Sequence, residues 1–313
     1  MSQTVKILVF ADLHGRMPQI LTDEEYDFII CPGDICLDNS RGMYSDFFTL
    51  KEEDPTLTFA EFLETHASKN SLDLEKESHS KGREILEYLN SLGKKVFLVP
   101  GNWDPTQYCD GIQKEEENIW NTLIQGLDNI IDCEYQKVDL EEFSVSVIGS
   151  GSTSAPEIIH KEMLTNKLQQ LEMMDLDEEE FEDERDELHQ RYLYQKGRYE
   201  ELVELFQNIE KNHFTIYISH NAPFKTPLDK IDNERSPAHG EHYGSIIARD
   251  LIEKFEPQLV VCGHIHEGVG VCKIQNSVCL NAGFGELINH VITLDLEKKV
   301  VKEIKKIGEN QRE

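Results

Sequence analysis

Short apolar runs rich in β-branched residues recur along the whole chain, and each run stops at Gly, Pro, Asn or Asp. They predict buried strands at residues 5–10, 28–31, 95–99, 144–149, 214–218, 258–262, 277–280 and 290–296. Helical spacing separates several of them. In residues 82–93, for example, apolar side chains from Ile85 to Leu92 share one face and Gly93 is the expected stop. The alternation predicts an α/β layered architecture, with a last hairpin after Asp295.

Two stretches interrupt this alternation and predict helical insertions in a single domain that spans residues 1–313. They cover about residues 40–81 and about residues 160–212, and the second carries about a dozen acidic residues in its middle. Such a charge run is usually a solvated helix face, and a lid or a surface that docks a protein partner is the alternative. No candidate ligand falls between residues 105 and 219, so the acidic insertion is expected to lie outside the site.

Polar residues that can bind metals follow five of the predicted strands. These strand ends read Asp12-Leu13-His14-Gly15, Pro32-Gly33-Asp34, Pro100-Gly101-Asn102-Trp103-Asp104, Ser219-His220-Asn221 and Gly263-His264-Ile265-His266. The carboxyl edge of such a sheet is where ligand sites form, and two residues spaced as in His-x-His can face the same side of a strand. Each motif alone is a weak signal, but the five together indicate one site.

The residue types in these motifs indicate divalent-metal chemistry. A carboxylate has two oxygens and can span two ions about 3.5–4 Å apart, so Asp34 is the natural bridge. Imidazole, carboxylate and amide ligands favour Mn, Fe, Co, Ni or Zn without singling out one metal. The cysteines nearest to the motifs, Cys36 and Cys262, are expected to be core thiols. We therefore expect two divalent transition-metal ions as cofactors.

The ordered motifs, which span residues 12–266, resemble those of the calcineurin-like metallophosphoesterase superfamily. The stretches 219–229, 240–245 and 281–284 are most similar to its Icc-related branch. The resemblance implies an α/β fold, a four-layer α/β/β/α sandwich of two β-sheets flanked by helices, around a binuclear metal centre. It implies that one ion is held by Asp12, His14, Asp34 and His266. It implies that the other ion is held by Asp34, Asn102, His220 and His264.

One position departs from the superfamily pattern. Many members carry a histidine after the Gly-Asn pair, where it protonates the leaving group or stabilises the transition state, and here the residue is Trp103. Candidate replacements for this general acid are His239 and His242 in the polar loop 232–245, although both could be ordinary exposed histidines. His242 is our catalytic candidate.

Three more residues are candidates for supporting roles. Asp104 could orient the metal ligands or simply serve a turn. Arg16 could hold a phosphate oxygen or could be solvated, and Asn102 and His220 are expected to help neutralise the phosphoryl group. These assignments rest on position in the motifs and on the implied site.

Charge limits the class of substrate. The formal net charge is -29, so the mean surface field repels polyanions and argues against long nucleic acid as a partner. No apolar stretch reaches the roughly 18 residues of a membrane helix, and the seven cysteines form no C-x-x-C pair, so a cytoplasmic protein without a membrane partner is expected.

The predicted function is hydrolysis of small phosphodiesters or nucleotide-like phosphoesters, with diesters favoured over monoesters. The resemblance implies that a metal-bound hydroxide attacks phosphorus. The alternative is a non-catalytic scaffold or binding module built on the same fold. Trp103 and the acidic insertion favour that alternative, while the retained ligand set opposes it because buried polar residues are costly to keep.

Overall fold

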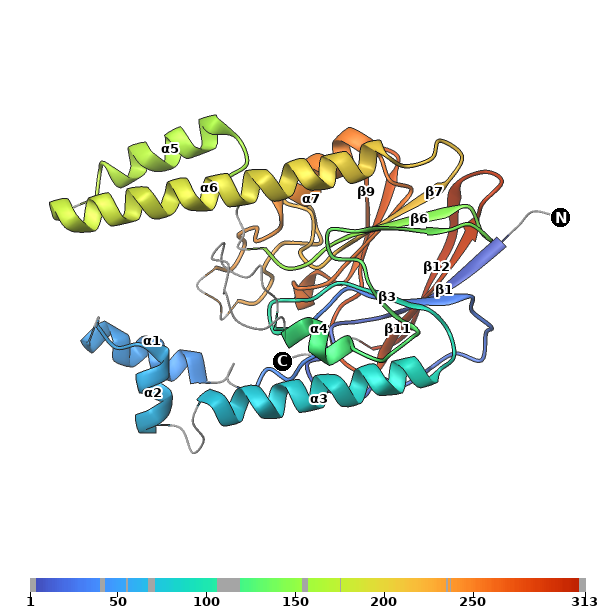
Figure 1. Cartoon of the computed structure of the whole chain (residues 1–313), viewed down its shortest axis with the longest axis horizontal. Coiled ribbons are helices and arrows are strands. Elements are labelled where there is room, and N and C mark those ends of the chain that lie inside the picture. Colours follow the sequence, from blue (N-terminus) through green and yellow to red (C-terminus); the bar gives the residue numbers. More distant parts are fainter. Residues whose placement is uncertain are drawn as a thin grey trace.

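The strands of the computed structural model form two mixed β-sheets that pack face to face (Figure 1). The structure describes residues 4–309 except for 40–42, 55, 67–70, 106–118, 154–156, 175, 235 and 237. Within these residues each sheet has six strands, in the orders β12-β11-β1-β2-β3-β4 and β5-β6-β7-β8-β10-β9. In the first sheet β1, β2, β3 and β4 are parallel, and in the second β6, β7, β8 and β10 are parallel.

The two antiparallel strands at one edge of the first sheet, β11 and β12, are longer than the other strands. The first sheet contains β1 (Thr4–Phe10), β2 (Phe28–Cys31), β3 (Val96–Leu98), β4 (Ile130–Asp132), β11 (Ile288–Asp295) and β12 (Val300–Gly308). The second contains β5 (Lys137–Leu140), β6 (Val145–Ser150), β7 (Phe214–Ser219), β8 (Leu259–Cys262), β9 (Gly270–Ile274) and β10 (Ser277–Asn281).

Helices cover the outer face of each sheet. Helices α3 (Ser71–Ser91) and α4 (Ile119–Ile124) lie on the first sheet, where Leu86 and Leu89 of α3 share an apolar cluster with strands β1 to β3. The C-terminal part of α6 (Glu178–Gln207) and α7 (Ile246–Phe255) lie on the second sheet, where Phe206 packs edge-on against Tyr217. These layers confirm the predicted α/β fold with two sheets flanked by helices.

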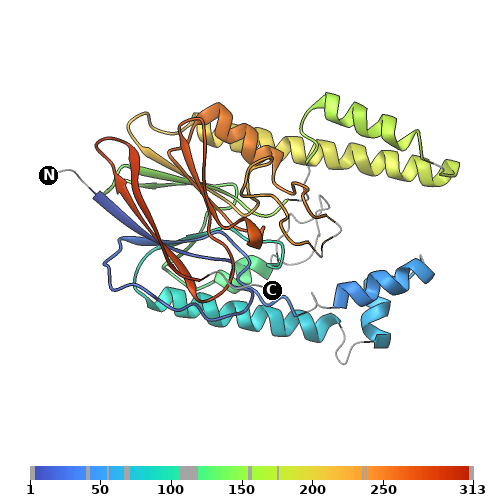
Figure 2. The ribbon, with the colours of Figure 1, turned by 180° about the vertical axis from the view of Figure 1, so that it is seen from behind.

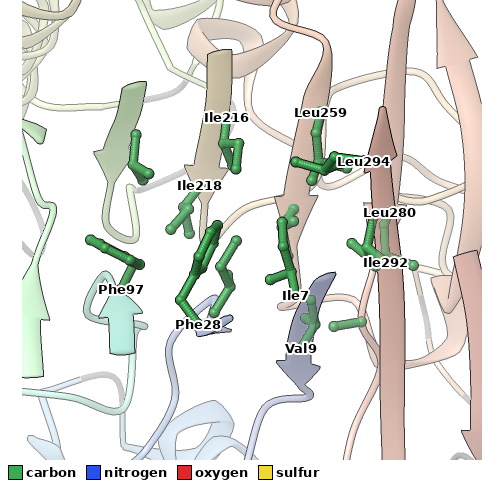
Figure 3. Packing of buried hydrophobic residues seen from close by; sticks show 14 of the residues in the cluster. Ile7, Val9, Phe28, Phe97, Ile216, Ile218, Leu259, Leu280, Ile292 and Leu294 are labelled. Carbon is green, nitrogen blue, oxygen red and sulfur yellow. The ribbon is translucent and has the colours of Figure 1, made fainter. Parts of the chain in front are cut away.

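The main hydrophobic core lies between the two sheets. Figure 3 shows Ile7, Val9 and Phe28 of the first sheet facing Ile216, Ile218 and other apolar side chains of the second. The strand residues in the centre of both sheets are fully buried on both faces. This explains why the sequence shows continuous apolar runs there and not an alternating pattern.

The structure refines the predicted elements. The helix expected at 82–93 begins earlier, at Ser71, and so takes in the end of the first predicted insertion; it ends just before Gly93, which has a positive φ of 67°. The short strands β4, β5 and β9 were not among the predicted runs, because each has only three to five residues and none is buried along its whole length. The hairpin expected after Asp295 is the pair β11 and β12.

The two segments that the sequence predicts to be insertions both contain helices. The first holds α1 (Tyr44–Glu53) and α2 (Phe59–His66), and the second holds α5 (Lys161–Leu171) and the whole of the long helix α6. Figures 1 and 2 show that α1 with α2, and α5 with the start of α6, project past the same end of the sandwich. Among the described residues, no helix combines the length and the apolar character needed to cross a bilayer.

Candidate metal centre

The seven predicted ligands follow the C-terminal ends of five strands from both sheets. Asp12 and His14 follow β1, Asp34 follows β2 and Asn102 follows β3, while His220 follows β7 and both His264 and His266 follow β8. Because β1 to β3 are parallel, and β7 and β8 are parallel, these ends meet at one edge of the sandwich. The sequence pattern therefore corresponds to one place in the fold.

Four of these residues form a buried group with the donor atoms that a metal requires. Asp12, His14, Asp34 and His266 each place a ligand atom within 4.8 Å of the others, and all four are buried. His14 Nε2 lies 3.2 Å from His266 Nε2 and 3.3 Å from Asp34 Oδ2. His266 Nε2 lies 3.5 Å from Asp12 Oδ2. This group is the set that the family resemblance implies for the first ion.

The remaining predicted ligands form a second group beside the first. The side-chain oxygen of Asn102 lies 3.1 Å from His220 Nε2 and 2.9 Å from His264 Nδ1. His220 Nε2 lies 3.4 Å from Asp34 Oδ2, the same oxygen that faces His14. Asp34 thus adjoins both groups. Asn102 is exposed, so the second group is open to solvent while the first is enclosed.

The unsatisfied polar atoms of the site fit a bound cation. Asp12 is fully buried, and its Oδ1 accepts no hydrogen bond from the described residues, while Oδ2 accepts one from the His264 backbone N–H at 2.6 Å. A buried carboxylate oxygen without a donor is costly unless a positive charge lies next to it. The donor set of imidazole nitrogens, carboxylates and one amide oxygen is suited to divalent transition metals.

The ionisable groups of the site strongly perturb one another. Burial raises the pKa of Asp34, but the neighbouring His220 and His14 lower it by more than burial raises it. The pKa of Asp34 therefore lies below its usual value. Burial lowers the pKa of His220, yet the Asp34 charge outweighs this and raises it to about 9. For His264, removal from water and the nearby His220 together lower the pKa to about 4. Such opposed shifts are typical of functional sites.

The backbone turns sharply at three of the ligands. His14, Asp34 and His264 have φ values of 45°, 52° and 68°, in the left-handed region that residues with a Cβ rarely adopt. The chain also approaches closely at Gly101 and Gly263. A Cβ at Gly101 would overlap the Asp34 carboxylate, and one at Gly263 would overlap the Asp12 carboxylate. These conformations turn the ligands off the strand ends and into the site.

Asp104 connects the loops that carry two of the ligands. Its carboxylate is buried and accepts backbone hydrogen bonds from Gly101 at 2.8 Å, Cys36 at 2.8 Å and Ile35 at 3.0 Å. Burial raises the pKa of Asp104, and the charge of Asp34 raises it further. Asp104 therefore ties the residues after Asp34 to the glycine before Asn102. A positioning role for Asp104 stays a prediction.

Trp103 and Arg16 both lie next to the candidate ligands. The Trp103 backbone N–H donates to Asp34 Oδ1 at 2.9 Å. This hydrogen bond to the candidate ligand does not depend on the indole side chain. The Arg16 guanidinium lies over the ring of Phe284, 4.6 Å from its centroid, and Nη1 is 3.8 Å from a carboxylate oxygen of Glu286. Its side chain is 45% exposed and can therefore still reach a ligand in solvent. A role for Arg16 in phosphate binding stays a prediction.

His242 belongs to a loop that is organised by a buried carboxylate. Its Nδ1 lies 2.8 Å from Oδ1 of Asp229, which is fully buried and also accepts backbone hydrogen bonds from Thr226 and Gly244. The aspartate fixes the imidazole so that Nε2 is the nitrogen left to act on a substrate. His239, the other candidate, is exposed. Catalytic use of either histidine stays a prediction.

Two residues near the site received no role from the sequence. The Asn281 side-chain amide donates to the carbonyl oxygens of Leu228 at 3.0 Å and Ile265 at 2.9 Å, so it joins the Asp229 loop to the chain between His264 and His266. Phe284 stacks on His266 with ring centroids 4.4 Å apart and 12° between the planes. The late Asn-Ala-Gly-Phe stretch was the available signal, and it indicated a branch of the family without indicating these contacts.

The neighbouring cysteines remain outside the ligand set. Cys36 and Cys262 are buried free thiols, and burial raises the pKa of both well above the usual value. A protonated thiol is a poor ligand and a poor nucleophile. This agrees with the expectation that they are core thiols. Another cysteine, Cys109, lies outside the described residues.

The fold and the site together define a two-sheet α/β protein with a clustered Asp/His site suited to divalent metal. Comparison with known families then gives the identity at the level of family. The chain belongs to the calcineurin-like phosphoesterase family, whose sequence profile matches residues 5–268. This confirms the resemblance drawn from the motifs and supports a metal-dependent hydrolase.

Individual relatives are distant. An uncharacterized protein of Methanocaldococcus jannaschii is 26% identical over 207 residues, which cover 64% of this chain and 70% of the relative. One crystal structure matches 98% of this chain and 99% of its own with a TM-score of 0.59 at 17% identity. A candidate 5'-nucleotidase from Staphylococcus aureus, solved with alpha-ketoglutarate, matches 99% of this chain and 55% of its own, with a TM-score of 0.50 at 11% identity. The two structures support the fold.

Proposed function

We propose that the protein is a phosphoesterase that uses two divalent transition-metal ions to hydrolyse small phosphodiesters or nucleotide-like phosphoesters. The observation that carries the proposal is the position of Asp34, whose Oδ2 lies 3.3 Å from His14 Nε2 and 3.4 Å from His220 Nε2. One carboxylate shared by two ligand groups is the arrangement that a two-ion centre needs. Mn, Fe, Co, Ni and Zn all suit the donor set.

Each group would hold one ion. Asp12, His14, Asp34 and His266 would bind the enclosed ion, and Asp34, Asn102, His220 and His264 would bind the exposed one. When bound, such ions act as Lewis acids that neutralise phosphoryl charge and acidify water at the site.

The protein's own hydrogen bonds orient these ligands. His220 Nδ1 donates to the Pro32 carbonyl at 3.0 Å, which leaves Nε2 as the nitrogen that faces the site. The backbone N–H of Trp103 holds Asp34 Oδ1, so Oδ2 is the oxygen that faces both groups.

The surroundings of the site support a small diester as the substrate. A diester carries one negative charge on the transferred group and so needs less cationic compensation than a monoester dianion. We assign Arg16 to a phosphate oxygen, on the exposed side of the Phe284 ring. We assign the proton for the leaving group to His242, which Asp229 holds in place. The net charge of -29 opposes docking of long nucleic acid.

A non-catalytic scaffold is the alternative function, and the geometry opposes it. A scaffold has no use for a buried carboxylate oxygen without a hydrogen-bond donor, as in Asp12, or for a strained backbone at His14 and Asp34. Both features destabilise the fold in the absence of a ligand. Their presence supports a site that binds metal.

The test combines metal analysis with a panel of chromogenic esters. The purified protein should contain up to two transition-metal ions per chain and should hydrolyse bis(p-nitrophenyl) phosphate faster than p-nitrophenyl phosphate. Asp34→Asn should lower the occupancy of both ions and reduce turnover at least about 100-fold. The matched control is Asp132→Asn, which changes a carboxylate at the end of β4 that accepts from Trp120 and lies outside both ligand groups.

The outcomes separate the two functions. A folded protein that binds no transition metal, or binds it without hydrolysing any ester, would support the scaffold. Full metal content in the Asp34→Asn protein would overturn the bridging role of Asp34. Faster cleavage of duplex DNA than of small diesters at matched salt would overturn the proposed substrate class.

A further inference from the structure

A second group of possible metal ligands lies at the opposite end of the second sheet. Glu141, Glu210 and His213 place one ligand atom each within 4.8 Å of the others. Glu141 follows β5, Glu210 follows α6, and His213 directly precedes β7. The candidate ligand His220 follows the same strand, so at about 3.3 Å per residue the two places are roughly 20 Å apart.

A chain of hydrogen bonds fixes the tautomer of His213. The Ser146 hydroxyl donates its only proton to Asp139 Oδ1 at 2.6 Å, and it lies 2.9 Å from His213 Nδ1. Since the hydroxyl proton is already used, the serine oxygen accepts, and His213 Nδ1 must be the donor. Lys137 Nζ lies 2.6 Å from the other oxygen of Asp139 and keeps that carboxylate ionised. Burial raises the pKa of Asp139, but Lys137 and Ser146 lower it below its usual value.

The consequence is a lone pair that faces carboxylates. In the neutral form of the imidazole, a proton on Nδ1 leaves Nε2 as an acceptor, and this atom lies 3.5 Å from Glu210 Oε2. The distance is too long for a good hydrogen bond, and two acceptors cannot bond to each other. His213 is 4% exposed, whereas Glu141 and Glu210 are exposed. A buried nitrogen therefore points toward two carboxylates that an ion can approach from solvent.

We propose that Glu141, Glu210 and His213 form a second metal site, distinct from the phosphoesterase centre, that binds one divalent ion of the zinc class. One imidazole and two carboxylates are common ligands of Zn²⁺, and water can complete the tetrahedron on the exposed side. The bond from His213 Nδ1 to Ser146, supported by Asp139, is the outer hydrogen bond that a metal-binding histidine requires. The ion connects the β5–β6 hairpin to the junction between α6 and β7.

The test measures Zn²⁺ binding by equilibrium dialysis and elemental analysis in an Asp34→Asn background, which weakens the main centre. Glu141→Gln with Glu210→Gln should remove one equivalent of zinc or weaken its binding at least about 100-fold. Ser146→Ala should weaken it about 10- to 100-fold, because the histidine loses its orienting partner. The control is Glu204→Gln, the same change at an exposed residue in the last turns of α6, and it should leave zinc binding unchanged.

A spectroscopic measurement identifies the ligand directly. Zinc should shift the ¹⁵N resonance of His213 Nε2 while Nδ1 keeps its proton. If both nitrogens of His213 are protonated at pH 7 and zinc leaves them unchanged, the group is an ion pair with Glu210 and the proposal is wrong. Equal zinc content in the parent and the double variant would also overturn it. Neither result bears on the phosphoesterase centre, whose test is the metal content and activity of the unmodified protein.

Discussion

Asp104→Asn is the substitution that tests most directly how the loops position the metal ligands. The side chain keeps its shape, but one of the two carboxylate oxygens becomes an NH₂ group. Asp104 Oδ1 accepts from Ile35 and Cys36, whereas Oδ2 accepts from Gly101 at 2.8 Å. In either orientation of the new amide, at least one buried backbone N–H then faces another donor.

The magnitude follows from these contacts. A hydrogen bond to a charged group contributes about 1.5–3 kcal/mol, and a buried donor left without a partner costs about 1–3 kcal/mol. The repulsion between Asp104 and Asp34, which contributes to the raised pKa of Asp104, is relieved by the change and offsets part of this loss. We expect the free energy of unfolding to fall by about 2 kcal/mol. Because the loop after Asp34 loosens, metal affinity should fall about 10- to 100-fold.

The assay pairs urea unfolding with equilibrium dialysis of the metal, both at pH 7. Asp132→Asn is the matched control, because Asp132 also accepts from a backbone N–H, that of Glu134 at 2.8 Å, without touching the ligand loops. The control should lose stability and keep its metal affinity. If Asp104→Asn also keeps wild-type metal affinity while losing stability, Asp104 holds the turn together and does not position the ligands.

The sequence predicted the layers of the fold and the ends of the strands that carry the site. Central strands such as β2 and β7 are buried on both faces, and this produces apolar runs that can be recognised without a structure. The edges of the sheets were harder to predict. In β5 all four residues are partly buried, and the three residues of β4 owe their pairing to β3. These strands depend on neighbours that are far away in sequence, so local patterns did not predict them.

The candidate site also has a part that the sequence predicted and a part that it did not. Strand-end motifs identified all seven residues that the two groups contain, because parallel strands bring their carboxyl ends together. The hydrogen bonds that connect the loops could not be predicted from the sequence. Asn281 joins two loops through backbone carbonyls, and Asp229 holds His242 from 13 positions away. Such bonds depend on where the partner backbone lies, which sequence spacing does not encode. The His213 group was missed because its ligands follow no motif.

Two further substitutions probe the leaving group and the stability of the first sheet. Trp103→His should raise turnover by an amount that grows with the pKa of the leaving group, up to about 100-fold for alkyl esters. Equal changes for all esters would show that position 103 does not face the leaving group. His290 is 2% exposed, and burial, with a smaller contribution from Lys306, lowers its pKa from 6.5 to about 4. The unfolded chain therefore binds this proton more tightly than the folded one, and stability present above pH 6.5 is lost as the pH falls toward 4. Between pH 7 and pH 5 the loss from this residue should be about 2 kcal/mol. In urea unfolding, His290→Phe should lose correspondingly less stability over that range than the wild type, and parallel pH profiles would refute a buried neutral His290.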